Sequence, residues 1–75
     1  MLNKLLPIVN MVLESRGRAR ITEITENTHL RNQIGFDSLD LAQLTVLIEA
    51  EYGIDVFEAG IVNTIGEIEA KLATR

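Results

Sequence analysis

The side chains with the clearest chemical potential stand together in the stretch GFDSLDLAQL, residues 35–44. A serine, Ser38, lies between two acids, Asp37 and Asp40, and an apolar helical pattern follows directly. Serine and aspartate are common at helix N-termini, where their side-chain oxygens accept backbone N–H bonds. A serine on an exposed turn can also carry a covalent group. Two interpretations therefore stand: the cluster only caps a helix, or Ser38 bears a modification.

Ser38 lacks the surroundings of a catalytic nucleophile. The one histidine, His29, lies in a loop, and no strand-turn-helix elbow surrounds the serine. Two neighbouring acids would not stabilise an oxyanion. Asp37 and Asp40 lack the alternating ligands and the glycine of an EF-hand, and the chain has no cysteine for a thiolate metal site. We therefore predict no catalytic residue, no enzyme activity and no metal site.

The elements before this cluster are a helix and a long loop. Apolar residues from Leu5 to Leu13 keep helical spacing, and we expect the regular helix to begin at about Pro7 and to end at Gly17. Residues 18–35 form a connection without a sustained period. Its spaced apolar residues predict an ordered loop that is pinned across the core, and they are Ile21, Ile24, Leu30 and Ile34.

The elements after the cluster are also helical. The second helix is predicted over about residues 37–52, with Gly53 ending it. A short turn around Phe57 is expected to contribute one or two helical turns. Thr64 then opens the last helix as its N-cap, and Glu67 completes a capping box. No segment alternates as a strand does, so every predicted element is a helix or a loop.

Length and pattern together define the fold class. The 75 residues make one domain, residues 1–75. We predict an all-α fold with three main helices, one short helix and a long first loop, packed as a small bundle. A chain of this size buries only ~60% of its unfolded surface, which leaves no room for a deep catalytic cleft beside a full core.

Charge and hydropathy exclude several classes of partner. The formal net charge of −4 argues against nucleic-acid binding and favours partners with basic surfaces. No apolar run approaches the ~20 residues of a membrane span, and the N-terminal apolar stretch is amphipathic without a cleavage site. We therefore expect a cytoplasmic protein that does not insert into membranes. Three arginines, Arg16, Arg18 and Arg20, are expected to complement the C-terminal end of the first helix dipole.

The second helix carries two apolar faces. Its core stripe uses Leu41, Leu44, Ile48 and Tyr52. A second face contains Leu39, Ala42 and Val46, and its rim contains Asp37, Asp40 and Glu49. Such a face is either a docking surface for a partner or a second buried side of a central helix. The periodicity alone leaves both interpretations open.

The stretch GFDSLDLAQL resembles the attachment site of acyl carrier proteins, in which a D-S-L triplet opens the second helix. The similarity covers nearly the whole chain. ITEITENTHLRNQIGFDSL resembles the first loop of that family, and IEAEYGIDV resembles the end of its second helix. The resemblance implies an antiparallel four-helix bundle that acts as a monomer and supplies no catalytic group.

The same resemblance implies a cofactor and partners. Ser38 would carry 4′-phosphopantetheine, donated from coenzyme A by a phosphopantetheinyl transferase, and the arm's thiol would hold acyl groups as thioesters. The other expected partners are an acyl-loading ligase or synthase and acyltransferases of fatty acid, lipid or polyketide biosynthesis. They would dock on Asp37, Leu39, Asp40, Ala42, Val46 and Glu49. Residues expected to line a cargo pocket are Leu44, Ile48, Phe57, Ile61, Val62 and Ile68.

The chain departs from the family pattern at several positions near the site. Gln43 and Thr45 replace a common acid and a common aliphatic residue, Arg31 stands among residues that are often acidic, and Phe36 replaces a small residue. The tail resembles carriers of specialised pathways. Two alternatives therefore stand beside an acyl carrier: an aminoacyl or peptidyl carrier loaded by an adenylating ligase, and an unmodified helical adaptor. Asp37 directly before the serine favours the acyl carrier.

Overall fold

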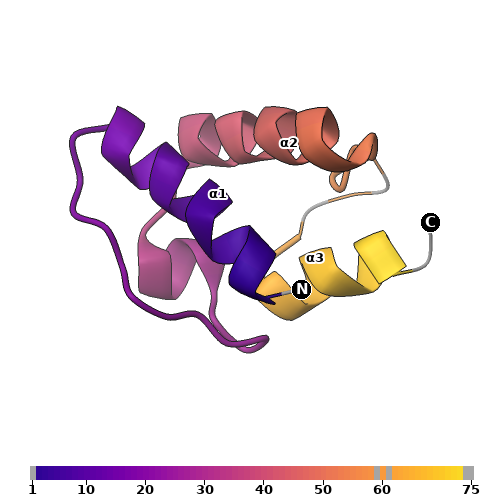
Figure 1. Cartoon of the computed structure of the whole chain (residues 1–75), viewed down its shortest axis with the longest axis horizontal. Coiled ribbons are helices and arrows are strands. Elements are labelled where there is room, and N and C mark those ends of the chain that lie inside the picture. Colours follow the sequence, from indigo (N-terminus) through magenta and orange to yellow (C-terminus); the bar gives the residue numbers. More distant parts are fainter. Residues whose placement is uncertain (1, 59, 61, 74–75) are drawn as a thin grey trace.

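The computed structural model describes residues 2–58, 60 and 62–73, and the regular structure of these residues is helical throughout. The elements are α1 (Leu2–Ser15), the π-helix η1 (Leu30–Ile34), α2 (Ser38–Tyr52) and α3 (Ile65–Ala73). Helix α2 lies beside α1 and runs in the opposite direction, while the loop after α1 sweeps around one side of the molecule (Figure 1). The prediction of an all-α bundle with three main helices and one short one is confirmed.

A single apolar core joins all of these elements. Each helix contributes a buried stripe, and the loops contribute further apolar side chains. The core residues are Leu5, Ile8, Val9, Val12, Leu13, Ile24, Leu30, Ile34, Phe36, Leu41, Leu44, Ile48, Val56, Val62, Ile65, Ile68 and Leu72. Within the described part of the chain, no helix is long and apolar enough to cross a membrane.

Helix α1 begins earlier than the sequence indicated. It starts at Leu2, so Pro7 lies inside it. A proline within a helix removes one backbone hydrogen bond, and the burial of Leu5 beside it anchors the first turns to the core. The predicted end is confirmed: Gly17 has φ 72°. Hydrogen bonds from its N–H to the Glu14 carbonyl and from the Arg18 N–H to the Leu13 carbonyl form a Schellman motif.

The short helix lies in the first loop rather than around Phe57. The expectation of helical turns there is wrong, because residues 56–58 form only a turn. The five-residue η1 forms instead, with His29 capping its start and Gly35 its end. The first residue of η1, Leu30, is fully buried. Packing of this side chain in the core stabilises η1, although its five residues are too few to show a helical period.

The first loop is fastened to the rest of the fold by hydrogen bonds. The buried side chain of Asn10 accepts from the Ile21 N–H at 2.9 Å and donates to the Ile21 carbonyl at 3.0 Å. Farther along, the Leu30 N–H donates to the Asn63 carbonyl at 2.8 Å. Ile24 and Leu30 are buried as predicted, so this connection is an ordered part of the domain.

The start of α3 is closed by this same loop. The Ile65 N–H donates to the Thr28 carbonyl at 3.0 Å, and the Gly66 N–H donates to the Glu26 carbonyl at 2.8 Å. A Cβ atom at Gly66 would lie 2.7 Å from the Glu26 carbonyl oxygen, so only glycine permits this approach. The Glu67 N–H donates to Thr64 Oγ1 at 3.2 Å, which confirms Thr64 as the cap.

Candidate functional site

Ser38 is the first residue of α2, and its side chain is exposed. The residue before it, Asp37, caps the helix by accepting the Asp40 N–H at 2.9 Å. The Asp40 carboxylate in turn accepts the Asp37 N–H at 2.9 Å, which completes a capping box. The capping role therefore belongs to the two acids. Because they bond each other's backbone, the Ser38 hydroxyl is not needed for the cap.

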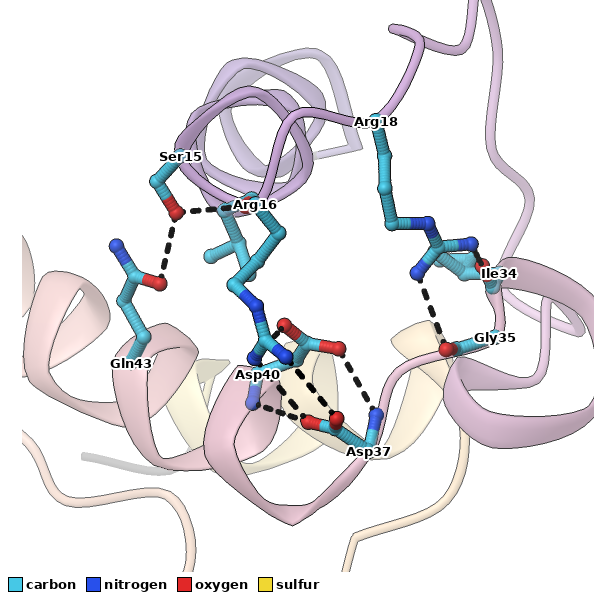
Figure 2. Close-up of polar contacts among 9 residues, drawn as sticks. Ser15, Arg16, Arg18, Ile34, Gly35, Asp37, Asp40 and Gln43 are labelled. Atoms are coloured by element: carbon cyan, nitrogen blue, oxygen red, sulfur yellow. Dashed lines mark hydrogen bonds and ion pairs between the residues drawn. The ribbon is translucent and has the colours of Figure 1, made fainter.

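Arg16 connects this helix start to the end of α1. Its Nη1 donates to Asp40 Oδ1 at 2.8 Å, and its Nη2 lies 3.3 Å from Asp37 Oδ2 (Figure 2). Asp40 is only 3% exposed, so the prediction that it lies on the exposed rim of the second face of α2 is wrong. An acid at this position can be buried because Arg16 and the Asp37 N–H together satisfy its charge.

A second arginine holds the loop that leads to Ser38. Arg18 donates to the Ile34 carbonyl at 2.6 Å and to the Gly35 carbonyl at 3.1 Å (Figure 2). The first is the last carbonyl of η1 and the second belongs to its C-cap, so Arg18 complements the C-terminal end of η1 rather than that of α1. The expectation that these side chains complement the C-terminal end of α1 is therefore wrong for both arginines, since Arg16 pairs with Asp37 and Asp40 and Arg18 binds the end of η1.

The pKa of the Asp37 carboxyl is lowered below its ordinary value of 3.8. The first cause is the Asp40 N–H that the carboxylate accepts, and the Arg16 guanidinium lowers the pKa further, while partial desolvation acts in the opposite direction. The site therefore keeps an ionised carboxylate next to Ser38 at neutral pH. This carboxylate remains accessible, since 57% of its side chain is exposed.

The second apolar face of α2 is open to solvent. Leu39 is 70% exposed and Val46 is 66% exposed, and Ala42 and Glu49 are exposed on the same helix. Leu41, Leu44 and Ile48 are buried in the core as expected. The interpretation that this face is a second buried side of the helix is therefore wrong. Exposed large apolar side chains on one helix are a feature of many surfaces that bind a partner.

A groove of about 410 Å³ opens beside Ser38. It lies between η1, α2 and the turn after α2, and its walls are formed by Arg31, Ser38, Leu41, Ala42, Thr45, Asp55 and Phe57. A larger hollow of about 540 Å³ lies under the first loop, and Ser38 is not among its lining residues. The groove is therefore the cavity that bears on the chemistry of the serine.

The groove differs from the pocket that the sequence suggested. Of the expected pocket residues, Phe57 lines it. Four others are packed in the core at 0–1% exposure: Leu44, Ile48, Val62 and Ile68. Ile61 lies outside the described residues. The space next to Ser38 is thus on the surface of the bundle.

His29 has a structural role in the first loop. Its Nδ1 accepts the Asn32 N–H at 3.1 Å, and its own N–H donates to Gln33 Oε1 at 2.6 Å, so it caps η1. Among residues 2–58, 60 and 62–73, no cluster of histidine, aspartate and glutamate has the arrangement of a metal site. His29 therefore stabilises the first loop, and neither of these hydrogen bonds involves Ser38.

Sequence reasoning missed the arginines as parts of the site. Arg16 contacts acids 21 and 24 residues away, and no local pattern reports such a contact. The run SRGRAR was a signal that the sequence did offer, because it gathers three arginines just after a helix. Ser15 adds another link, since its hydroxyl lies 2.9 Å from Gln43 Oε1 on α2.

Comparison with known families matches this chain to one of them. The family model described as the phosphopantetheine attachment site matches residues 8–72. The matched region includes all of the residues that position Ser38. No solved structure matches the chain.

Proposed function

Because the chain belongs to the phosphopantetheine attachment-site family, we propose that it is an acyl carrier protein modified at Ser38. Members of this family are carriers that bear 4′-phosphopantetheine. The observation that supports this most directly is the exposed Ser38 hydroxyl at the start of α2, beside an open groove. Carriers of this family work with phosphopantetheinyl transferases and biosynthetic enzymes. The pathway that we propose is fatty acid, lipid or polyketide biosynthesis in the cytoplasm.

The residues around Ser38 fit such a group. The capping box of Asp37 and Asp40 fixes the first turn of α2 and leaves the serine oxygen exposed. The first N–H groups of a helix have no intrahelical partner, and together with the helix dipole they favour a bound anion. The start of α2 therefore stabilises the negative charge of a phosphodiester on Ser38. The negative charge of Asp37 acts in the opposite direction.

The modification is a phosphoryl transfer with coenzyme A as donor. The Ser38 oxygen attacks the phosphorus next to the pantetheine, and the bond from that phosphorus to the second phosphate breaks. The leaving group is 3′-phosphoadenosine 5′-phosphate, and the hydroxyl proton passes to a base on the transferase. The arm supplies a terminal thiol that binds acyl groups as thioesters. This chain's own part is to position the serine and present the arm.

Intact-mass measurement tests the attachment. The protein is incubated with coenzyme A and a broad-specificity phosphopantetheinyl transferase, and we expect a mass increase of one phosphopantetheine group. The chain contains two serines, both exposed at helix ends, so Ser15 supplies a matched control. The increase should vanish in Ser38→Ala and persist in Ser15→Ala. No increase with several transferases would favour the unmodified adaptor.

The cargo requires a separate measurement. An aspartate directly before the modified serine resembles the acyl carrier proteins, so Asp37 favours an acyl carrier over an aminoacyl or peptidyl carrier. Protein purified from its native host is treated with hydroxylamine, which cleaves thioesters, and the released group is identified by mass. An acyl hydroxamate supports the proposal. An aminoacyl hydroxamate would replace it with a carrier loaded by an adenylating ligase.

We further propose that partners dock on the exposed face of α2, through Leu39, Ala42 and Val46, with Asp37 and Glu49 attracting basic residues. Asp40 is not part of this surface, because Arg16 already pairs with it. Val46→Glu is expected to lower kcat/KM of the transferase roughly fivefold to tenfold, the effect of one apolar interface contact. Met11, 52% exposed on α1, provides the control as Met11→Glu. Equal losses in both variants would contradict the docking face.

A further inference from the structure

The groove beside Ser38 has an apolar floor and two charged walls. Leu41 and Ala42 come from α2, and Phe57 packs against the edge of the core from the turn after it. The Thr45 hydroxyl donates to the Leu41 carbonyl at 2.9 Å, so it is already paired inside the helix. The groove thus offers mainly carbon surface to whatever extends from Ser38.

Arg31 is the cation of this groove. Arg16, Arg18 and Arg20 each reach a carboxylate or a carbonyl oxygen. Within the part of the chain that the structure describes, the Arg31 side chain has neither an ion pair nor a hydrogen bond, although it lines the groove together with Ser38. The acid on the same walls, Asp55, is engaged with its own turn, since its Oδ1 accepts the Phe57 N–H at 3.0 Å.

A group on Ser38 brings an anion to this position. The inference rests on the proposed function, in which Ser38 bears a phosphodiester with one negative charge. We propose that Arg31 binds this phosphodiester and that the first segment of the arm lies along the groove against Leu41, Ala42 and Phe57. A guanidinium matches phosphate oxygens with two parallel N–H donors. The branched dimethyl carbon, which follows the phosphate after one ester oxygen and one CH2 group, is apolar and suits the carbon surface of the groove.

The closed core supports a surface position for the arm. Leu44, Ile48, Val62 and Ile68 are at most 1% exposed, so the segment nearest the serine meets the groove before it meets any interior space. Arg31 is then a positioning residue. Arg31 favours an arm that lies toward the turn after α2. The opposite direction leads toward α1, where Arg16 is paired with Asp37.

The test compares backbone amide spectra of the apo and holo proteins by nuclear magnetic resonance. In the wild type, modification should shift the signals of Ala42, Thr45 and Phe57 as well as those next to Ser38. In holo Arg31→Ala, the shifts at Thr45 and Phe57 should fall roughly two- to fivefold, the range that one exposed ion pair supports, and salt should have a similar effect. Arg31→Lys should retain part of them.

Arg20→Ala is the matched control, because Arg20 is an exposed arginine paired with Glu14 outside the groove. It should leave the shifts unchanged. The proposed position of the arm is wrong if the shifts are confined to the neighbours of Ser38, or if both arginine variants change them equally. Either result leaves the proposed carrier function unaffected. Intact mass is recorded for every sample, so a failure to modify Ser38 at all is seen separately and overturns both proposals.

Discussion

The starts of α2 and α3 carry the same kind of capping pattern in the sequence, and the fold treats them differently. Both have an oxygen-bearing cap followed three residues later by an acid, Asp37 with Asp40 and Thr64 with Glu67. At α3 the backbone of the first loop covers the first N–H groups. At α2 only side chains make the cap, and the first residue of the helix stays exposed.

This difference separates a structural helix start from one that can accept a modification. The first residue of α3, Ile65, is fully buried, so it is not accessible to a transferase. A start that is capped by side chains at its edge keeps its first residue accessible, and the dipole remains available to an anion. The comparison predicts that variants at α3 act mainly on stability and that variants at Ser38 act mainly on modification.

The largest effect is expected at the covered start. Gly66→Ala places a Cβ 2.7 Å from the Glu26 carbonyl oxygen, so the loop must move away from α3. Overpacking of this kind costs about 1–3 kcal/mol, and here it should also weaken the two hydrogen bonds from the loop. Urea unfolding measures the loss. A variant as stable as the wild type would mean that the first loop does not need this close approach.

The next effect is expected where the open start meets α1. Asp40→Ala removes the acceptor of the Arg16 and Asp37 N–H bonds and should lower the free energy of unfolding by about 1–2 kcal/mol. Arg16 can return partly to water, which limits the loss. Glu49→Ala removes the same charge from an exposed position of α2, and it should cost less than about 0.5 kcal/mol. Similar losses in both variants would contradict a special role for Asp40.

A pH effect distinguishes Asp37 from the cap of α3. Its pKa is lower in the folded protein than the ordinary 3.8, so the stability that it contributes is fully present above that value. This contribution is lost as pH falls through the folded pKa. Asp37→Asn keeps a capping oxygen and removes the titration. The melting temperature should therefore fall less steeply between about pH 5 and pH 2 in this variant than in the wild type.

The smallest effect on stability is expected at the serine itself. Ser38→Ala removes an exposed hydroxyl that the cap does not use, so unfolding free energy should stay within about 0.5 kcal/mol of the wild type. The same variant should lose all modification. A loss near that of Gly66→Ala would show that Ser38 is itself a structural cap, and the contrast between the two helix starts would then disappear.

Local chemistry explains which parts of the fold the sequence predicts. The bounds of α2 follow from Asp37 and Gly53, because capping and left-handed backbone depend on neighbouring residues only. The same holds for Gly17 and Thr64. Apolar spacing in the first loop identified Ile24 and Leu30 as buried, since a long connection needs side chains that anchor it.

Contacts between distant segments explain what the sequence could not predict. The five residues of η1 are too few to show a period, and packing of Leu30 and Ile34 decides their conformation. From the sequence, Asp40 is predicted to be exposed. Its partner, Arg16, lies 24 residues away, so no local pattern indicates the ion pair that allows its burial. Phe36, noted only as an unusual neighbour of the site, is a core residue at 3% exposure and fixes the chain just before Asp37.

From the loop that covers α3 we also expect an order of events when the chain folds. Helix α3 has nine residues, and a helix this short is marginal in water on its own. The acceptors for its first two N–H groups come from Glu26 and Thr28, nearly forty positions earlier. Bringing these segments together costs loop-closure entropy before any contact compensates for it. We therefore expect the last helix to form late, on a surface that the first half of the chain has already built.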